Sequence, residues 1–189
     1  MFALTGKEST EMKAVISGDG ICLRFVTPDD ADYIYGLRLD PTYNTHLSPI
    51  TGTADDQRRW IGAYKTREAA GLEFYYIIQR HDGLRCGTVR LYDIREDSFT
   101  WGSWILDHNK PKKAALESAL LSFGAGFESL NKEKALIEVR HLNTHAIAFY
   151  RRFGAIETGR DAENLYLTLS RVAYQNNKSV FFRAIESAQ

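Results

Sequence analysis

The sequence has few cysteines and prolines, no excess charge and no long apolar run, and each shortage excludes a class of protein. Cys22 and Cys86 are too few for a disulfide framework or a metal site, so we expect a reducing, cytoplasmic environment and no metal. Basic and acidic residues number 24 each, and without a basic excess we expect no nucleic-acid partner. No apolar run suits a signal peptide at the start of the chain or a bilayer span elsewhere, so we expect no membrane partner.

The length and composition are those of a globular protein with one sizeable core. The chain has 189 residues, of which 44% are hydrophobic and 25% charged. Its four prolines and 14 glycines are scattered, so no stretch marks a domain boundary. We therefore predict a single domain over residues 1–189, with a tail over 1–12, a core over 20–170 and a C-terminal helix over 171–189.

The first half of the chain predicts two helices between strands. A short hairpin, or a strand with a preceding edge strand, is expected over residues 13–27. Thr27 and Pro28 indicate the start of a helix that ends near Leu39, and Thr53 opens a second helix. Aromatic and β-branched residues, with a hairpin signal between the first two segments, predict three strands in series at 73–81, 84–94 and 98–106.

The second half begins with a helical period. Apolar residues at helical spacing predict an amphipathic helix over about 112–130, and a strand follows over 134–141. A short helix begins at the Asn143 cap and stops at Gly154, before two more strands. The order β-α-α-β-β-β-α-β-α-β-β predicts an α+β fold with a mixed, mostly antiparallel twisted sheet flanked by helices. One parallel pair is expected across the strand–helix–strand unit of residues 98–141.

The start of the 112–130 helix is a candidate anion site. The first amides of a helix have no internal partner, and together with the helix dipole they attract anions. Lys110, Lys112 and Lys113 add positive charge at a place where basic side chains oppose the dipole. A bound phosphate would explain this arrangement. The alternative is that the three lysines are simply solvated.

Asn143 and Tyr150 form a second candidate site. They are seven residues apart, so they share one face of a helix within roughly 20°. A capping asparagine and a phenol two turns later would line one groove. The alternative is an ordinary cap followed by a core tyrosine beside Phe149 and Phe153.

From the strand at 98–106 onward, and over most of residues 20–170, the sequence resembles the GNAT superfamily of N-acetyltransferases. The family's helix pattern N-x-x-A-x-x-x-Y-x-x-x-G is matched by Asn143, Ala146, Tyr150 and Gly154. Its loop pattern Q/R-x-x-G-x-G/A corresponds to KPKKAA, in which Lys113 replaces the central glycine. The resemblance implies a GNAT-like fold and an acyltransferase that moves an acetyl group from acetyl-CoA to an amine.

The resemblance also implies roles for individual residues. The strands that end near Leu106 and begin near Ala135 would splay apart, and the pantetheine arm would lie between them. Tyr150 would protonate the leaving thiolate, while a backbone amide near Ile105 would stabilise the oxyanion. The residues implied in acetyl-CoA binding are Ile105, Leu106, Lys110, Lys112, Lys113, Ala114, Ala115 and Asn143.

The acceptor is expected to be a primary amine of a small molecule, held by loops such as residues 40–52. Tyr43 and His46 in that loop, and His141 at a strand end, are the candidate substrate-binding residues. No general base is assigned, although Glu138 lies on one face of the preceding strand. The chain looks similar to GNAT enzymes that acetylate nucleotide-linked amino sugars. It looks almost as similar to Rim-like enzymes that acetylate protein N-termini, and a degenerate CoA-binding or regulatory domain and a homodimer both stay open.

Overall fold

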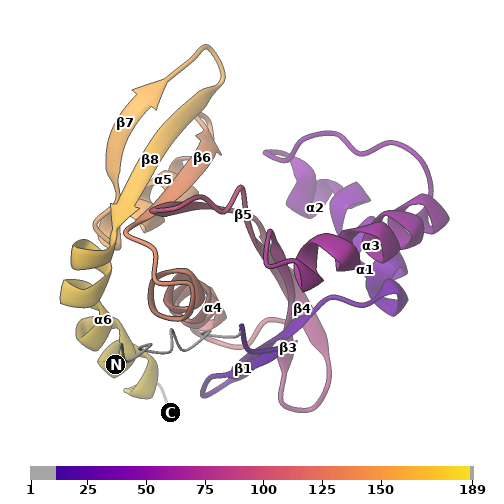
Figure 1. The fold of residues 1–189 in the computed structure, drawn as a ribbon, viewed down its shortest axis with the longest axis horizontal. Helices are drawn as coiled ribbons and strands as arrows, with labels where there is room; N and C mark the ends of the chain where they lie inside the picture. The colour runs from indigo at the N-terminus through magenta and orange to yellow at the C-terminus, as the bar shows by residue number, and fades with distance from the viewer. Residues whose placement is uncertain (1–11, 188–189) are drawn as a thin grey trace, which may run out of the picture.

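The computed structural model describes residues 12–187, so the expected N-terminal tail lies outside the described residues except for Met12. Within that range the strands form one sheet in the order β1-β2-β3-β4-β5-β6-β8-β7 (Figure 1). Every neighbouring pair is antiparallel except β5–β6, as the sequence predicts. The strands are β1 Val15–Ser17, β2 Ile21–Phe25, β3 Phe74–Arg80, β4 Arg85–Tyr92, β5 Ser98–Leu106, β6 Lys134–Arg140, β7 Ile156–Arg160 and β8 Asn164–Ser170.

The helices follow the predicted order with three differences. The helix expected from residue 112 begins two residues later, because Lys113 has a left-handed backbone and is the N-cap. Its last turn is a π-helix, Ala125–Ser129. A short helix, α2, was not predicted, although Asp40 caps it by accepting a bond from the Thr42 amide at 2.8 Å. The α-helices are α1 Ala31–Leu39, α2 Pro41–Asn44, α3 Ala54–Ala69, α4 Ala114–Gly124, α5 Thr144–Arg152 and α6 Arg171–Glu186.

Helices cover both faces of the sheet, and β3 shows how its residues divide between them. Tyr75 and Ile77 belong to the buried cluster of α1 and α3, while their neighbours Tyr76 and Ile78 belong to the cluster of α4. This alternation is that of a strand buried on both faces. Figure 1 shows α1, α2 and α3 on the opposite side of β4 and β5 from α4. The C-terminal helix α6 is more than a surface helix, since Tyr174, Phe181 and Ile185 are buried in the α4 cluster.

The sheet opens between β5 and β6. Their parallel pairing covers only Ser98–Thr100 against Lys134–Leu136, whereas β6 pairs with β8 along its whole length. Beyond Thr100, β5 carries a β-bulge, because Arg90 of β4 pairs with Gly102 but Thr88 pairs with Ile105. The predicted splay of the two central strands is thus present, and one edge of each strand is left without a strand partner.

The described residues include neither a membrane-spanning helix nor a cluster of metal-binding side chains. Between residues 12 and 187, no helix combines the length and the apolar character needed to cross a membrane. In the same range, no cluster of three or more histidine, cysteine, aspartate or glutamate side chains could hold a metal ion.

Candidate active site

A cavity of about 340 Å³ lies where β5 and β6 part. Its walls come from α1, the α1–α3 connection, the strands β3, β4, β5, β6 and β8, and α5 with its cap. The residues that line it are mostly polar or aromatic and include Arg38, Tyr43, His46, Trp104, Glu138, Asn143 and Tyr150. Ligand sites commonly occupy about 300–1,000 Å³ and combine an apolar wall with a few polar groups. The cavity has both properties, and we call it the cleft.

Tyr150 is brought to the cleft by the aromatic packing of α5 against β5. The side chain is 6% exposed, and its ring packs against Trp101 and Trp104 at centroid distances of 5.6 and 6.2 Å. Burial raises the pKa of the phenol well above its ordinary value, with no charged neighbour contributing. The hydroxyl therefore stays protonated at neutral pH and is available as a proton donor.

The bulge in β5 determines which side chains face Tyr150. Side chains of a regular strand alternate, so Trp101 and Trp104 would lie on opposite faces without an extra residue between them. Ser103 has φ +49° within the bulge, and both indoles then face α4. The Trp101 indole donates to Ser122 at 2.8 Å and the Trp104 indole donates to Ser118 at 3.1 Å. Two buried serines of α4 therefore hold the wall against which Tyr150 packs.

Asn143 stands where the sequence predicts, as the cap of α5. Its side-chain oxygen accepts a hydrogen bond from the Ala146 amide at 3.2 Å. Asn143 and Tyr150 both line the cleft, so the predicted shared helix face is confirmed as geometry. The cap fixes the start of α5 and thereby the depth at which the phenol sits.

The open edge of β5 offers backbone amides. The Asp107 amide donates to the Cys86 carbonyl of β4 at 3.0 Å. Because successive amides of a strand point to opposite edges, the Ile105 amide also faces β4, while those of Trp104 and Leu106 face the opening. The backbone amides near Ile105 that could donate a hydrogen bond into the opening are therefore those of Trp104 and Leu106.

The loop before α4 presents further amides. None of the described residues accepts a hydrogen bond from the amides of Lys112, Lys113, Ala115 or Leu116. The Ala114 amide, in contrast, bonds to the Pro111 carbonyl at 3.2 Å. Lys113 has φ +66°, the conformation that glycine adopts most readily, at the place where the resemblance puts a glycine. Lys110, Lys112 and Lys113 are all exposed at this helix end.

Such a loop fits the pyrophosphate of a coenzyme. Orphan amides at a helix N-terminus bind anions, and nearby lysines add charge. A further hollow of about 310 Å³ adjoins the same helix end and is lined by Lys113, Ala115, Leu116, Phe149 and Arg152 among others. The sequence-predicted residues of this loop are therefore brought together, except that the Ala114 amide is already engaged.

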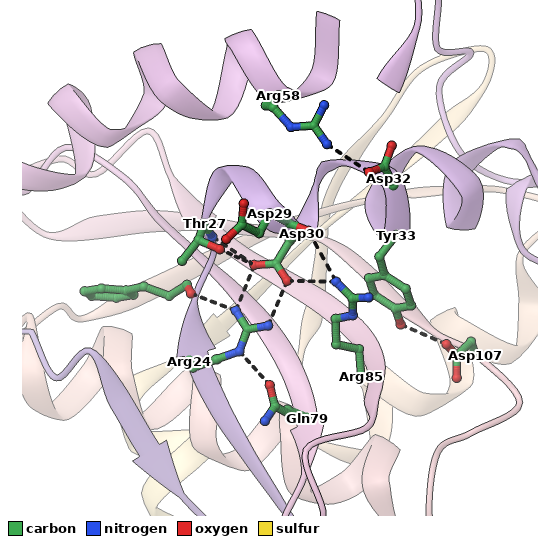
Figure 2. A network of polar contacts seen from close by, with 11 residues as sticks. Arg24, Thr27, Asp29, Asp30, Asp32, Tyr33, Arg58, Gln79, Arg85 and Asp107 are labelled. Carbon is green, nitrogen blue, oxygen red and sulfur yellow. Dashed lines mark hydrogen bonds and ion pairs between the residues drawn. The ribbon is translucent and has the colours of Figure 1, made fainter. Parts of the chain in front are cut away.

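A polar network fixes the loop to the rest of the fold (Figure 2). The Asp107 carboxylate, 4% exposed, accepts a hydrogen bond from the Tyr33 hydroxyl at 2.8 Å. It also accepts one from the Asn109 amide at 2.7 Å. The guanidinium of Arg85 lies 4.9 Å from the Tyr33 ring centroid and 3.3 Å from the Asp30 carboxylate. The α1 helix and β4 are thereby tied to the residues that lead into the loop before α4.

The Asp30 carboxylate is the centre of that network. Arg24 donates to both of its oxygens, at 2.7 and 2.8 Å, and the Thr27 amide donates at 2.9 Å. Burial by itself would raise the pKa of Asp30, but these hydrogen bonds outweigh burial and lower it. The carboxylate is consequently ionised at neutral pH and holds Arg24 and Arg85 in place.

The acceptor residues predicted from sequence divide into two groups. Tyr43 and His46 line the cleft, and the Tyr43 hydroxyl accepts from the His108 amide at 3.0 Å, which links α2 to the loop before α4. His141 does not line the cleft. Its Nε2 lies 2.9 Å from the Asp161 carbonyl, because the end of β6 turns toward the β7–β8 connection. The structure thus places His141 outside the cleft, and its assignment to the acceptor stays a prediction.

Two cleft residues were not assigned from the sequence. Glu138 is exposed and supplies the one carboxylate among the described cleft-lining residues. A signal was available, since Glu138 alternates with the buried residues Ala135, Ile137 and Val139 and so must face away from α4. Arg38, at the end of α1, carried no such signal, because its position depends on how the irregular segment after α1 folds back.

The comparisons agree with this geometry. A family model described as acetyltransferase (GNAT) domain matches residues 21–156. The chain is similar in structure to apo FdhC, described as a nucleotide-linked sugar GNAT, with 41% identity, a TM-score of 0.83 and coverage of 89% of this chain and 97% of that one. A comparison with curated proteins gives no significant match.

More distant structures share the fold alone. A variant of spermidine N-acetyltransferase SpeG from Vibrio cholerae is 18% identical, with a TM-score of 0.71 and coverage of 85% of this chain and 99% of that one. RimJ from Mycobacterium smegmatis in complex with CoA-disulfide is 16% identical, with a TM-score of 0.68 and coverage of 85% and 88%.

Proposed function

The chain belongs to the GNAT acetyltransferase family and is an N-acetyltransferase, and on that premise we propose that its acceptor is the amino group of a nucleotide-linked sugar. The support is the 41% identity to a nucleotide-linked sugar GNAT over nearly all of that chain. The enzymes that acetylate protein N-termini or polyamines resemble this chain at 12–18% identity, which carries the fold and no acceptor. Neither the protein N-terminal acceptor nor a degenerate, non-catalytic domain is favoured.

The donor of this family is acetyl-CoA. The pyrophosphate would bind the free amides and lysines of the loop before α4, at Lys110, Lys112, Lys113 and Ala115. The pantetheine amides would pair with the open edge of β5 beside Ile105, at Leu106, whose amide faces the opening. Asn143 would border the arm from the start of α5.

Three groups then carry the transfer. Glu138 accepts a proton from the acceptor ammonium, and the neutral nitrogen attacks the acetyl carbonyl carbon. The Trp104 amide, on the open edge of β5, donates to the acetyl oxygen as negative charge develops there. Tyr150 donates its proton to the sulfur as the carbon–sulfur bond breaks. The nitrogen loses its second proton as the amide forms, and this proton returns through solvent to the Tyr150 phenolate, while the proton held on Glu138 is released to solvent. The products are an amide and free CoA thiol.

The observation that carries the proposal is that one cleft brings together Tyr150, Glu138 and the polar acceptor loop at the opened strands. The test is an acceptor panel with acetyl-CoA, read by free thiol release and by the mass of the product. The panel contains UDP- and dTDP-linked amino sugars, the free amino sugars, spermidine and peptides. We expect the highest kcat/KM with a nucleotide-linked amino sugar, and none with its N-acetylated form. A preference for spermidine or peptides would contradict the proposal.

Glu138 has a separate test. Glu138→Gln should lower kcat by roughly 10²-fold or more, because the amide cannot take the proton from the acceptor. The matched control is Glu96→Gln in the exposed β4–β5 turn, which should keep full activity. Equal activity of the two variants would remove Glu138 from the mechanism and leave solvent as the base.

A further inference from the structure

A second cavity of about 280 Å³ adjoins the cleft on the acceptor side. It lies among α1, the segment after it, α3 and the strands β3 to β5. Arg38, Tyr75 and Ser103 line both hollows, so the two share a wall and form one path. The path begins at Tyr150 and Glu138 and ends at Trp60 on α3. Each hollow alone is at the small end of the range for ligand sites, whereas the two together suit a longer ligand.

Arg38 is the uncompensated cation on this path. Its guanidinium donates to the Ser48 carbonyl at 3.1 Å, and no carboxylate of residues 12–187 forms an ion pair with it. The other guanidinium groups along the path are already neutralised. Arg90 is paired with Glu73, and Arg140 is paired with Glu163. A guanidinium with donors to spare suits phosphate oxygens, which it can bind in a bidentate manner.

The far end of the path has the features of a base-binding surface. Trp60 is 37% exposed, although its neighbours on the buried side of α3 are fully covered. The Arg90 guanidinium lies 5.1 Å from the Trp60 ring centroid, so an indole and a guanidinium stand together beside the hollow. Bases stack on such groups. The Gln57 carboxamide lines the same hollow and can donate and accept at once, as the edge of a pyrimidine requires.

The geometry points to a subsite for the nucleoside diphosphate of the acceptor, with the diphosphate at Arg38 and the base in the hollow of Trp60, Arg90 and Gln57. The inference rests on the proposed function, since it locates the nucleotide part of that acceptor. The amino sugar then lies in the cleft, and its amine meets Glu138 and the acetyl group. The nucleotide contacts no residue of the loop before α4, so donor and acceptor bind through separate parts of the chain.

Direct binding tests the diphosphate contact. Calorimetry with UDP, dTDP and inorganic pyrophosphate should show that Arg38→Met weakens all three by about 10- to 100-fold, the effect of a lost charge-assisted hydrogen bond. Arg38→Lys, which keeps the charge, should recover part of the affinity. The matched control is Arg58→Met, on exposed α3 and outside both hollows, which should bind as the unaltered protein does. If all three arginine variants bind UDP and dTDP equally, or if the unaltered protein binds neither, the subsite is absent.

The base contact has its own variant. Trp60→Leu should weaken UDP and dTDP by roughly tenfold and leave pyrophosphate unchanged, because only the nucleosides have a base to stack. Phe182→Leu, at an exposed aromatic residue of α6, is the control and should change neither. Equal losses for pyrophosphate and nucleotide would overturn the placement of the base at Trp60.

Steady-state kinetics separates this inference from the proposed function. With a nucleotide-linked amino sugar as acceptor, Arg38→Met should raise the acceptor KM about 10- to 100-fold and keep the KM for acetyl-CoA. A protein that acetylates the nucleotide-linked sugar with an acceptor KM independent of Arg38 and Trp60 would refute the subsite and keep the proposed function. A protein that acetylates only spermidine or peptides would refute both.

Discussion

The two sides of the opened sheet present different chemical groups to the cleft. The donor side, formed by α4, α5 and the loop over residues 107–113, presents mainly backbone amides and a tightly packed aromatic wall. The acceptor side, formed by α1 to α3 and residues 40–53, presents charged and aromatic side chains from irregular segments. The descriptions of two structures of this fold name different acceptors, a nucleotide-linked sugar and spermidine. In the proposed function, the donor is bound mainly through backbone amides and the acceptor through side chains, which can change without altering the fold.

The largest effect is expected where the donor side meets the core. Ala119 is fully buried in α4, and Ala119→Glu should unfold the protein or nearly so, because an unpaired carboxylate would have to leave water among apolar side chains. The loss is measured by a thermal melt followed by circular dichroism. Ala162→Glu, in the exposed β7–β8 connection, is the matched control and should melt as the unaltered protein does. A normal melt for Ala119→Glu would mean that this face of α4 is not packed against the sheet.

The same difference explains how much could be predicted from sequence. Strand β5 and helix α5 were predicted nearly to the residue, since Asn143 and Gly154 mark both ends of α5 by local chemistry. The start of α4 was predicted two residues too early, because a lysine gives no sequence signal for the left-handed backbone that Lys113 adopts as the N-cap. The single-domain organisation, the cytoplasmic setting and a homodimer stay predictions.

The acceptor side could be predicted only in part. Tyr43 and His46 were found because they lie in a polar loop, but Arg38 and Trp60 look like ordinary helix residues until the chain folds back over them. That His141 lies outside the cleft could not be predicted, since a sequence shows that a strand ends and cannot show in which direction the chain then leaves. Specific positions in such segments depend on contacts between residues distant in sequence.

The second largest effect tests the catalytic use of the donor wall. Tyr150→Phe should lower kcat by roughly 10²–10⁴-fold and leave the KM for acetyl-CoA almost unchanged, because the lost proton matters mainly in the transition state. The measurement is steady-state thiol release together with a melting curve. Tyr174→Phe is the control, a buried tyrosine whose hydroxyl donates to the Leu120 carbonyl at 3.4 Å. It should lose about 1 kcal/mol of stability or less and keep kcat.

Full activity in Tyr150→Phe together with a lowered melting temperature would make Tyr150 a core residue. The donor side would then supply binding alone, and proton donation to the thiolate would have to come from solvent. That result would also make the two sides more alike, since each would then only bind and position its substrate.

The third prediction concerns the polar network around Asp30, which supports the acceptor side. Asp30→Asn should cost about 2–4 kcal/mol of unfolding free energy, because Arg24 and Arg85 lose a buried carboxylate. The pKa of Asp30 is lowered in the folded protein, so its stabilisation is present above the unfolded pKa of about 3.9 and is lost as the pH falls through the folded value. Urea unfolding between pH 7 and pH 3 should therefore show a smaller acid loss for Asp30→Asn. If the free energy of unfolding fell equally with pH in the two proteins, Asp30 would not be ionised in the folded network.

The fourth prediction concerns how much lysine charge contributes to acetyl-CoA binding at the loop before α4, beside the backbone amides. Replacing Lys110, Lys112 and Lys113 together by Glu should weaken acetyl-CoA binding at least about tenfold, since three attractive charges become repulsive. The affinity is measured by calorimetry at two salt concentrations, and the loss should shrink as salt rises. The affinity for UDP, bound on the other side, should not change. An unaltered acetyl-CoA affinity would place the pyrophosphate elsewhere.

The smallest effect is expected at Lys113 and separates its side chain from its backbone. A left-handed conformation costs an L-residue roughly 1–2 kcal/mol, whereas a glycine loses roughly 0.5–1 kcal/mol through its greater freedom in the unfolded chain. Lys113→Gly should therefore be neutral or stabilise the protein by up to about 1 kcal/mol, equivalent to a melting temperature higher by about 2–4 °C.

Lys112→Gly is the matched control, because it removes the same charge at a neighbouring residue whose φ is not positive. That variant should gain nothing and lose roughly 0.5–1 kcal/mol. Acetyl-CoA affinity should fall modestly and equally in both variants, since each loses one lysine and keeps its amide. Equal melting temperatures would show that Lys113 carries no strain. A much larger loss of affinity in Lys113→Gly would show instead that the Lys113 side chain contacts the phosphate, so that at this one position the donor side, too, relies on a side chain.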